Sequence, residues 1–173
     1  MRLFFALTFN DATKQDFARY QELVRSYGLE GHNTRTQNFH ITLAFIGECT
    51  EKEKQTLINL LHQLKSECGS LRIHRLGSFR QKRSKLLWLG IEHNHALTQL
   101  KEELDTALLT QNFVVESRDF IPHITLFRHV SGGSQVRDIH ITPRQISVYS
   151  IALMESSYRE SKLVYQVLDE IVQ

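Results

Sequence analysis

Two short segments of the sequence repeat a pattern that can carry out proton transfer. The run His-Ile-Thr-Leu occurs at residues 40–43 and again at residues 123–126. The pKa of a histidine lies near neutrality, so one neutral imidazole can take a proton from water while another, protonated, gives a proton to a leaving oxygen. Threonine hydroxyls can donate hydrogen bonds to phosphate oxygens. The repeated pattern therefore indicates acid–base cleavage of a phosphate ester.

Strand geometry would display these groups together. Successive side chains of a strand alternate between its faces, so His40 shares a face with Thr42, and His123 shares a face with Thr125. If the two strands face each other, both imidazoles and both hydroxyls converge on one pocket, where the threonines can bind phosphate oxygens. A single His-x-Thr is usually explained by a buried, hydrogen-bonded histidine, but its repetition in one chain favours the functional interpretation.

Arg128 is a further candidate for binding the phosphate. Strand alternation places it on the same face as Leu126, which points into the core. It reaches the pocket only if the strand ends or bulges before it, and its charge would then stabilise the transition state.

Three helices that would position these strands are predicted from apolar spacing and capping residues. The first follows Asn10 and ends at Gly28, the second opens with the capping box Thr50–Glu53, and the third starts near Asn94. The predicted buried face of the first helix is Phe17, Tyr20, Leu23, Val24 and Tyr27. That of the second is Leu57, Leu60, Leu61 and Leu64, and that of the third is Leu97, Leu100, Leu104 and Leu108. Strand-like runs occupy residues 2–8, 39–46, 71–79, 86–91, 123–127, 145–154 and 162–168.

These elements predict an α+β fold rather than a doubly wound sheet, because the segment near residues 80–85 reads as a hairpin between adjacent strands. Each repeat lies about midway through its half of the chain, which predicts two pseudo-symmetric lobes. Each lobe would have an antiparallel-rich sheet and helices, with the active-site cleft between the lobes. No linker is visible, so residues 1–173 are predicted to form a single bilobal domain.

Composition narrows the class of protein. The chain is 41% hydrophobic and 23% charged with a formal net charge of +2, which indicates a soluble globular protein and requires any attraction to phosphate to come from local clustering. Cys49 and Cys68 show neither zinc-site spacing nor a disulfide framework, so a cytoplasmic location is predicted. The apolar start at residues 1–8 is too short to span a membrane. The sequence predicts a monomer with no metal, no cofactor and no membrane partner.

These residues resemble the two-histidine phosphoesterase superfamily, and within it the bacterial RNA 2′,3′-cyclic phosphodiesterases, also called 2′-5′ RNA ligases. The resemblance covers nearly the whole chain. Residues 38–48 and 120–128 are similar to the two signature segments of the family, residues 2–6 to its first strand and residues 87–90 to a core strand.

The resemblance implies metal-independent hydrolysis of a 2′,3′-cyclic phosphate to a 2′-phosphate, on RNA ends or on small cyclic nucleotides. His40 would give a proton to the leaving 3′ oxygen, and His123 would act as the base on water. Thr42, Thr125 and Arg128 would hold the phosphate. Weak reverse 2′-5′ RNA ligation could accompany hydrolysis, because one site must catalyse both directions.

Two departures from the family's pattern fall at the predicted rim of the cleft. Residues 32–37 lack the Trp and the prolines that are common ahead of the first signature, and Ile121 stands where a polar or basic residue is common. These departures concern the choice of substrate rather than the chemistry.

A basic segment could guide RNA toward the cleft. Residues 72–85 contain six Lys or Arg residues and no acid. Arg80 and Arg83 could contact phosphates, and Phe79 could stack on a base. A solvated hairpin tip explains the same residues equally well. Trp88 is predicted to be a core residue.

Two other functions remain open on the sequence. Another two-histidine activity would be cleavage of 2′-5′-linked oligonucleotides. A protein of the same fold could instead bind nucleotide or RNA without catalysis. Replacing either histidine separates enzyme from binder, because the enzyme loses turnover whereas the binder keeps most of its affinity.

Overall fold

The computed structural model describes residues 1–131 and 138–173 of the chain. Within these ranges the chain forms nine β-strands, three α-helices and one short 3₁₀ helix, η1. In chain order they are β1 (Arg2–Thr8), α1 (Asp11–Ser26), β2 (Glu30–Asn33), η1 (Thr36–Asn38), β3 (Ile41–Glu48), α2 (Glu51–Gln63), β4 (Ser70–Arg80), β5 (Lys85–Ile91), α3 (His95–Thr110), β6 (His123–Ser131), β7 (Arg144–Ser147), β8 (Ser150–Arg159) and β9 (Lys162–Val172).

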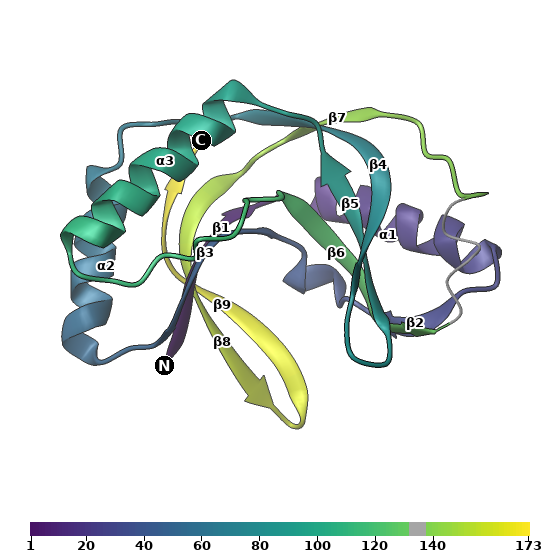
Figure 1. Cartoon of the computed structure of the whole chain (residues 1–173), viewed down its shortest axis with the longest axis horizontal. Coiled ribbons are helices and arrows are strands. Elements are labelled where there is room, and N and C mark those ends of the chain that lie inside the picture. The colour runs from purple at the N-terminus through teal and green to yellow at the C-terminus, as the bar shows by residue number, and fades with distance from the viewer. Residues whose placement is uncertain (132–137) are drawn as a thin grey trace.

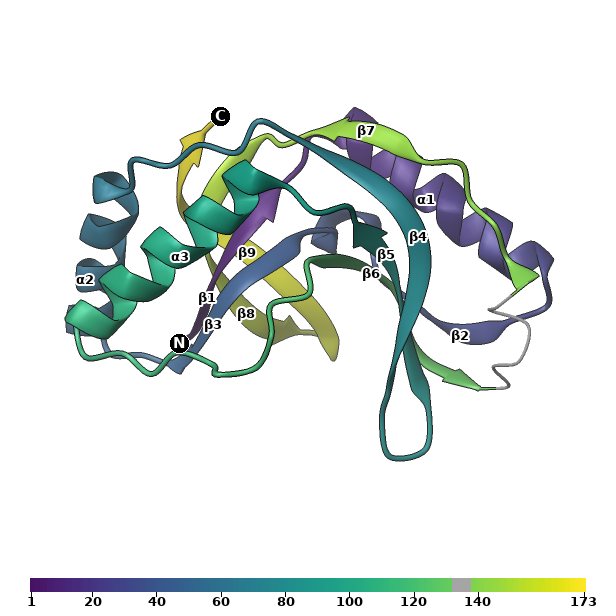
Figure 2. The ribbon, with the colours of Figure 1, turned by 45° about the horizontal axis from the view of Figure 1, so that its top comes forward.

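The described strands form two antiparallel sheets. Sheet A has the strand order β3-β1-β8-β9, and sheet B has the order β2-β6-β5-β4-β7. Helices α2 and α3 lie side by side at one end of the molecule, and α1 lies at the other (Figures 1 and 2). The α+β prediction is confirmed, and so is the hairpin that joins β4 to β5.

The repeated histidine segments lie in different sheets, but the sheets do not correspond to the two halves of the chain. Sheet A takes β1 and β3 from the first half and β8 and β9 from the second. Sheet B likewise takes β2 and β4 from the first half, β5 from the middle of the chain, and β6 and β7 from the second half. The two lobes are therefore interleaved along the sequence.

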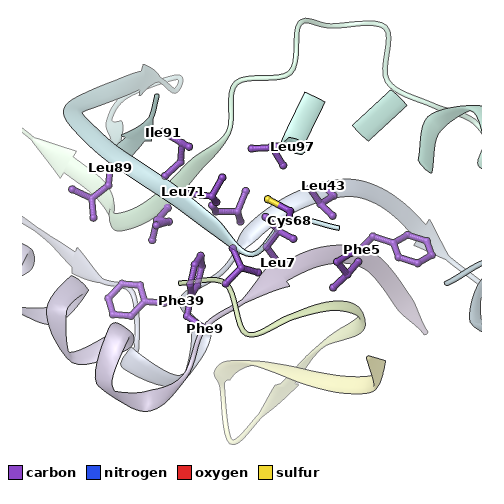
Figure 3. Close-up of a cluster of buried hydrophobic side chains, with 14 of the residues drawn as sticks. Phe5, Leu7, Phe9, Phe39, Leu43, Cys68, Leu71, Leu89, Ile91 and Leu97 are labelled. Atoms are coloured by element: carbon purple, nitrogen blue, oxygen red, sulfur yellow. The ribbon is translucent and has the colours of Figure 1, made fainter. Parts of the chain in front are cut away.

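One continuous core lies behind both sheets. On β1, Leu3, Phe5 and Leu7 are fully buried in this core, whereas Phe4 and Ala6 lie on the opposite face in a smaller cluster. Figure 3 shows residues of both sheets and of α3 in the main cluster, among them Phe5, Leu7, Leu43, Leu71, Leu89 and Leu97. Because the core occupies one face of each sheet, the other faces are available to line a cleft.

Each helix begins where its capping residue predicts. The side chains of Asn10, Thr50 and Asn94 accept hydrogen bonds from the backbone N–H groups three residues further on, at 2.9, 3.1 and 3.0 Å respectively. The leucine faces predicted for α2 and α3 are buried, apart from Leu64, which is half-buried just after α2. None of the described helices combines the length and the apolar character needed to cross a membrane.

The buried face of α1 differs from the prediction. Phe17 and Val24 are buried as predicted, but Leu23 and Tyr27 are 37% and 42% exposed. Gln21 is buried in their place and is only 5% exposed. A polar side chain occupies this position because it has hydrogen-bond partners inside the protein, which apolar spacing does not reveal.

The single strand predicted over residues 145–154 is wrong, because the segment forms β7 in sheet B and β8 in sheet A. Between them, the N–H of Val148 donates to the carbonyl of Gly69, and the N–H of Tyr149 donates to the carbonyl of Thr8. These two bonds transfer the chain from one sheet to the other. The sequence also does not predict β2 or η1, which are short and polar.

Candidate active site

Both histidine strands bulge at the leucine of the repeat. The pairing of β3 with β1 skips Leu43, and the pairing of β6 with β5 skips Leu126. A bulge shifts the alternation of the side chains that follow it. Arg128 is consequently turned toward the cleft instead of the core, and it lines a cavity there together with Thr125. Arg128 was predicted to reach the pocket only if the strand ended or bulged before it, and β6 does bulge at Leu126.

A buried glutamine holds the bulge of β6 in place. The amide Nε2 of Gln21 donates to the carbonyl of Leu126 at 3.0 Å and to the carbonyl of Thr34 at 2.9 Å. These bonds satisfy a bulge carbonyl that lies away from water. They also tie the segment after β2 to β6, so Gln21 links two walls of the site. The sequence analysis missed this residue, and its place on the buried side of α1 is the only local signal of its role.

His40 lies at the entrance to β3, with both ring nitrogens engaged. Its Nδ1 is 2.7 Å from the carbonyl of Asn38, and its Nε2 is 3.0 Å from the hydroxyl of Thr42. The ring also packs against Phe4 and Tyr165, with ring centroids 5.3 and 4.8 Å away. The predicted partnership of His40 with Thr42 is therefore a direct hydrogen bond.

Asn38 connects His40 to the other edge of sheet A. Its side chain is buried, donates to the carbonyl of Leu163 at 2.9 Å and accepts from the N–H of Tyr165 at 3.4 Å. These bonds hold β9 beside η1. They place the Tyr165 ring against His40, a contact that links residues far apart in the sequence and that the sequence analysis did not predict.

His123 is held in the same way on sheet B. Its Nδ1 is 2.7 Å from the carbonyl of Ile121, again the residue two positions earlier. Its ring packs edge-on against Phe79 at 5.0 Å between centroids and lies 5.6 Å from Trp88. A carbonyl can only accept, so in both neutral histidines Nδ1 carries the proton and Nε2 is the basic atom.

Burial and charge set the protonation of the pair. Burial lowers the pKa of His40 to about 4; the carbonyl of Asn38 opposes this effect, and the charges of Arg128 and His123 add to it. Burial also lowers the pKa of His123, opposed by the carbonyl of Ile121 and reinforced by Arg128. Both imidazoles are therefore neutral at neutral pH in the absence of an anion. Because Thr125 and Arg128 of β6 line the same cavity as His40, the two repeats face one site.

A cavity of about 350 Å³ opens beside His40. One part of its lining consists of His40, Thr125 and Arg128, which come from the segments of both repeats. One wall is made by residues 32–35 and Asn38, and the other by residues 161–163 and Tyr165 of the β8–β9 hairpin. The departure noted at residues 32–37 thus forms part of the cavity wall. His123 is not among the residues that line this cavity; its ring lies against the aromatic rings of sheet B.

The three residues predicted to contact RNA, Phe79, Arg80 and Arg83, do not lie together on one surface. Phe79 is half-buried against His123. Arg80 is exposed and, as its neighbour in a regular strand, points to the opposite face. Arg83 is exposed in the turn of the β4–β5 hairpin, which projects from the body of the molecule (Figure 2). Of the three, only Phe79 adjoins the catalytic pair.

Trp88 is more than the core residue that the sequence predicts. It is 3% exposed, yet its ring lies on the face of sheet B that carries His123. The guanidinium of Arg75 covers the ring at 4.9 Å, and Phe79 packs beside it at 4.9 Å. Trp88 therefore supports the catalytic side of sheet B.

Two imidazoles with basic Nε2 atoms, each followed by a threonine on a bulged strand, define a two-histidine phosphoesterase. Across the described residues, no group of three or more His, Cys, Asp or Glu side chains is arranged to hold a metal ion. The model of the LigT-like phosphoesterases matches residues 7–88, which include the first repeat.

Relatives extend this match over the whole chain. The RNA 2′,3′-cyclic phosphodiesterase of Thermotoga maritima is 28% identical and covers 98% of this chain and 94% of its own length. The enzyme of the same name from Aeropyrum pernix is 26% identical, covering 89% and 93%. The crystal structure of E. coli LigT complexed with 3′-AMP superposes with a TM-score of 0.80 at 25% identity, covering 99% of this chain and 97% of that one. The chain is thus similar to the LigT-like phosphoesterases in sequence and in fold, which confirms the resemblance.

Proposed function

We propose that this protein hydrolyses the 2′,3′-cyclic phosphate ends of RNA, or 2′,3′-cyclic nucleotides, to 2′-phosphates. The observation that carries the proposal is the pair of imidazoles, each fixed by a backbone carbonyl at Nδ1 so that Nε2 is the atom left for proton transfer. In His40 a bound substrate would replace the Thr42 hydroxyl at Nε2. The shared name of relatives that cover nearly the whole chain supports the same activity.

The residues divide the reaction between them. Water attacks phosphorus while the Nε2 of one histidine takes its proton, and the bond from phosphorus to the 3′ oxygen breaks. The second histidine, protonated at Nε2, gives its proton to that oxygen, and the phosphate stays on the 2′ oxygen. Thr42, Thr125 and Arg128 bind the nonbridging oxygens and stabilise the charge that builds up on them. Weak 2′-5′ ligation would use the same ring opening with the 5′ hydroxyl of a second RNA in place of water: its oxygen bonds to phosphorus, the base takes its proton, and the bond to the protonated 3′ oxygen breaks.

The first experiment uses an oligonucleotide with a 2′,3′-cyclic phosphate end in excess EDTA. Opening to a 2′-phosphate, identified by phosphorus NMR, is the expected result. His40→Ala and His123→Ala should each lower turnover by about 10²–10⁴-fold, while the exposed His93→Ala serves as the control. Binding without turnover would indicate a non-catalytic module. Turnover confined to 2′-5′-linked oligonucleotides would indicate the other phosphodiesterase activity.

A second experiment assigns the two proton-transfer roles. By family resemblance His40 is the acid and His123 the base, although burial lowers the pKa of His40 strongly in the free protein. A bound phosphate anion raises the pKa of a nearby imidazole and so restores its ability to donate. A cyclic substrate with sulfur in place of the 3′ oxygen has a leaving group that needs no proton. It should rescue His40→Ala but not His123→Ala, and the opposite rescue would reverse the roles.

In this proposal the protein acts as a cytoplasmic monomer, and residues 1–173 form one domain. Light scattering of the purified protein at several concentrations tests the oligomeric state. A mass that rises toward that of a dimer in the working range would contradict it.

A further inference from the structure

The carbonyl that holds His40 belongs to a residue that is itself fixed on two sides. Asn38 is 5% exposed, and its backbone carbonyl lies 2.7 Å from Nδ1 of His40. On one side, its backbone N–H donates to the carbonyl of Arg35 at 2.8 Å, within the turn of η1. On the other side, its side chain bonds to β9. The position of this carbonyl therefore depends on a strand from the far end of the chain.

The side chain of Asn38 takes the place of a neighbouring strand at the outer edge of β9. Strand β9 is an edge strand of sheet A, so one row of its backbone groups has no partner strand. The Asn38 amide donates to the carbonyl of Leu163 at 2.9 Å and accepts from the N–H of Tyr165 at 3.4 Å. An asparagine amide offers both a donor and an acceptor, as a peptide group does, so one side chain pairs with both backbone groups.

The position of the Asn38 carbonyl decides between two neutral tautomers of His40. With the proton on Nδ1, the ring donates to this carbonyl and Nε2 accepts from the hydroxyl of Thr42. With the proton on Nε2, the ring would donate to Thr42, and the lone pair of Nδ1 would face the carbonyl oxygen. The second arrangement is unfavourable only while the carbonyl stays where it is, because the Thr42 hydroxyl can serve either tautomer.

Sheet B fixes the equivalent carbonyl by a different means. Nδ1 of His123 lies 2.7 Å from the carbonyl of Ile121, whose side chain is apolar and 43% exposed and so forms no such clamp. The residue between them is Pro122, whose ring restricts its own φ. The corresponding residue before His40 is Phe39, which lacks this restriction. The two histidines therefore depend on different supports.

We propose that Asn38 is a positioning residue for His40, whose side chain clamps β9 and thereby keeps its own carbonyl where it holds the proton of His40 on Nδ1. The inference rests on the proposed function and deepens it, because it names the group that prepares one member of the catalytic pair. It requires no contact between Asn38 and the substrate, although Asn38 lines the cavity. Loss of the clamp should affect His40 and spare His123.

Nitrogen-15 NMR of the imidazole rings tests the inference without substrate. In the wild-type protein at neutral pH, both histidines should carry their proton on Nδ1. In Asn38→Ala, His40 should become a mixture of the two tautomers, while His123 stays unchanged and serves as the internal control. Asn59→Ala, at an exposed asparagine of α2, is the matched control variant. A His40 that keeps the wild-type tautomer in folded Asn38→Ala would overturn the inference.

Asn38→Ser is a second variant in case Asn38→Ala does not fold. Its shorter side chain cannot span both backbone groups of β9, so the same change at His40 is expected to a smaller degree. Circular dichroism confirms that the variant is folded before its spectrum is compared. Wild-type signals from His40 in this variant would also contradict the role of the side chain.

Kinetics separate positioning from a direct contact with substrate. For uridine 2′,3′-cyclic phosphate, Asn38→Ala should lower kcat/KM about tenfold or more, which is part of the ~10²–10⁴-fold that a positioned proton transfer supplies. In a His40→Ala background, the same substitution should change kcat/KM by less than about twofold, because no imidazole remains to be positioned. An equal loss in both backgrounds would mean that Asn38 acts elsewhere. If the wild-type protein hydrolyses no cyclic phosphate, the proposed function fails, and the NMR comparison still decides the role of Asn38.

Discussion

At the scale of single residues, the site depends on two imidazoles that are buried enough to be neutral. Each donates from Nδ1 to the carbonyl two residues earlier, which fixes the same tautomer in both lobes. Burial costs a charged imidazole its hydration, so it lowers the pKa of both rings. The same effect that prepares a base also makes the protein sensitive to acid.

Stability should fall in acid because of His40. Its pKa is about 6.5 in an unfolded chain and about 4 in the folded protein, so between these values the unfolded state binds more protons. The contribution is fully present above the unfolded pKa and is lost as pH falls toward the folded pKa. The free energy of unfolding should therefore drop by about 2 kcal/mol between pH ~7.5 and pH ~4.5 from this residue alone.

Urea denaturation at the two pH values measures this effect. His40→Gln should lessen the loss, whereas the exposed His93→Gln should leave it unchanged. If His40→Gln shows the full wild-type loss, acid sensitivity arises elsewhere.

At the scale of the elements, bulges and glycines decide which side chains reach the cleft. The leucine bulge of β6 turns Arg128 toward the cavity, and α1 secures that bulge through Gln21. In sheet B, the ring of Trp88 lies directly across Gly77 of β4, where only a residue without a Cβ leaves room.

Gln21→Met should impair phosphate binding without touching the substrate. It leaves the carbonyl of Thr34 without this donor, while the carbonyl of Leu126 keeps the N–H of Thr34 at 2.9 Å, and the loss should cost about 1–3 kcal/mol of stability. It should also raise KM more than it lowers kcat, because the position of Arg128 becomes less defined. In a double-mutant cycle, Arg128→Ala should cost less in Gln21→Met than in the wild type. Gln55→Met on the exposed side of α2 is the control, and strictly additive effects would refute the coupling.

Gly77→Ala should disturb the ring that supports His123. An added Cβ would lie 2.3 Å from the ring of Trp88, which is 3% exposed, so the buried ring would have to shift. Such overpacking should cost about 1–3 kcal/mol and lower kcat by displacing Trp88 toward His123. Gly69→Ala is the matched control, since a Cβ there meets nothing within 4 Å. Thermal melts and steady-state kinetics of both variants test this, and equal behaviour would contradict it.

At the scale of the whole molecule, the lobes are interleaved and share one core. Strand β1 pairs with β8, and β5 pairs with β6, so both sheets need strands from both ends of the chain. The projecting β4–β5 and β8–β9 hairpins, visible in Figure 1, come from opposite halves of the sequence as well.

Cutting the chain in the loop before α3 should therefore yield no folded half. The fragment of residues 1–92 would contain β1 and β5 but lack their neighbours β8 and β6. The fragment of residues 93–173 would contain β8 and β6 but lack β1 and β5. Each fragment expressed alone should lack a cooperative unfolding transition by circular dichroism. A cooperative transition in either fragment would mean that the halves fold independently.

The sequence by itself determined the chemistry and the local elements. The duplicated His-Ile-Thr-Leu, the helix starts at Asn10, Thr50 and Asn94, and the β4–β5 hairpin depend on residues close together in the chain, and local patterns report them. The resemblance of these local motifs to a known family also predicted the fold class.

Only the tertiary structure decided how these parts form a site. The bulges at Leu43 and Leu126, the role of Gln21 and the cavity walls formed by residues 32–35 and 161–163 arise from contacts between distant segments. The pairing of strands from both ends of the chain within each sheet likewise depends on contacts between distant segments. A bulge changes which face a side chain occupies without changing its type, and a buried glutamine is recognisable only through the carbonyls it meets. For that physical reason, hydrophobic periodicity places Arg128 toward the core, while the fold turns it toward the cleft.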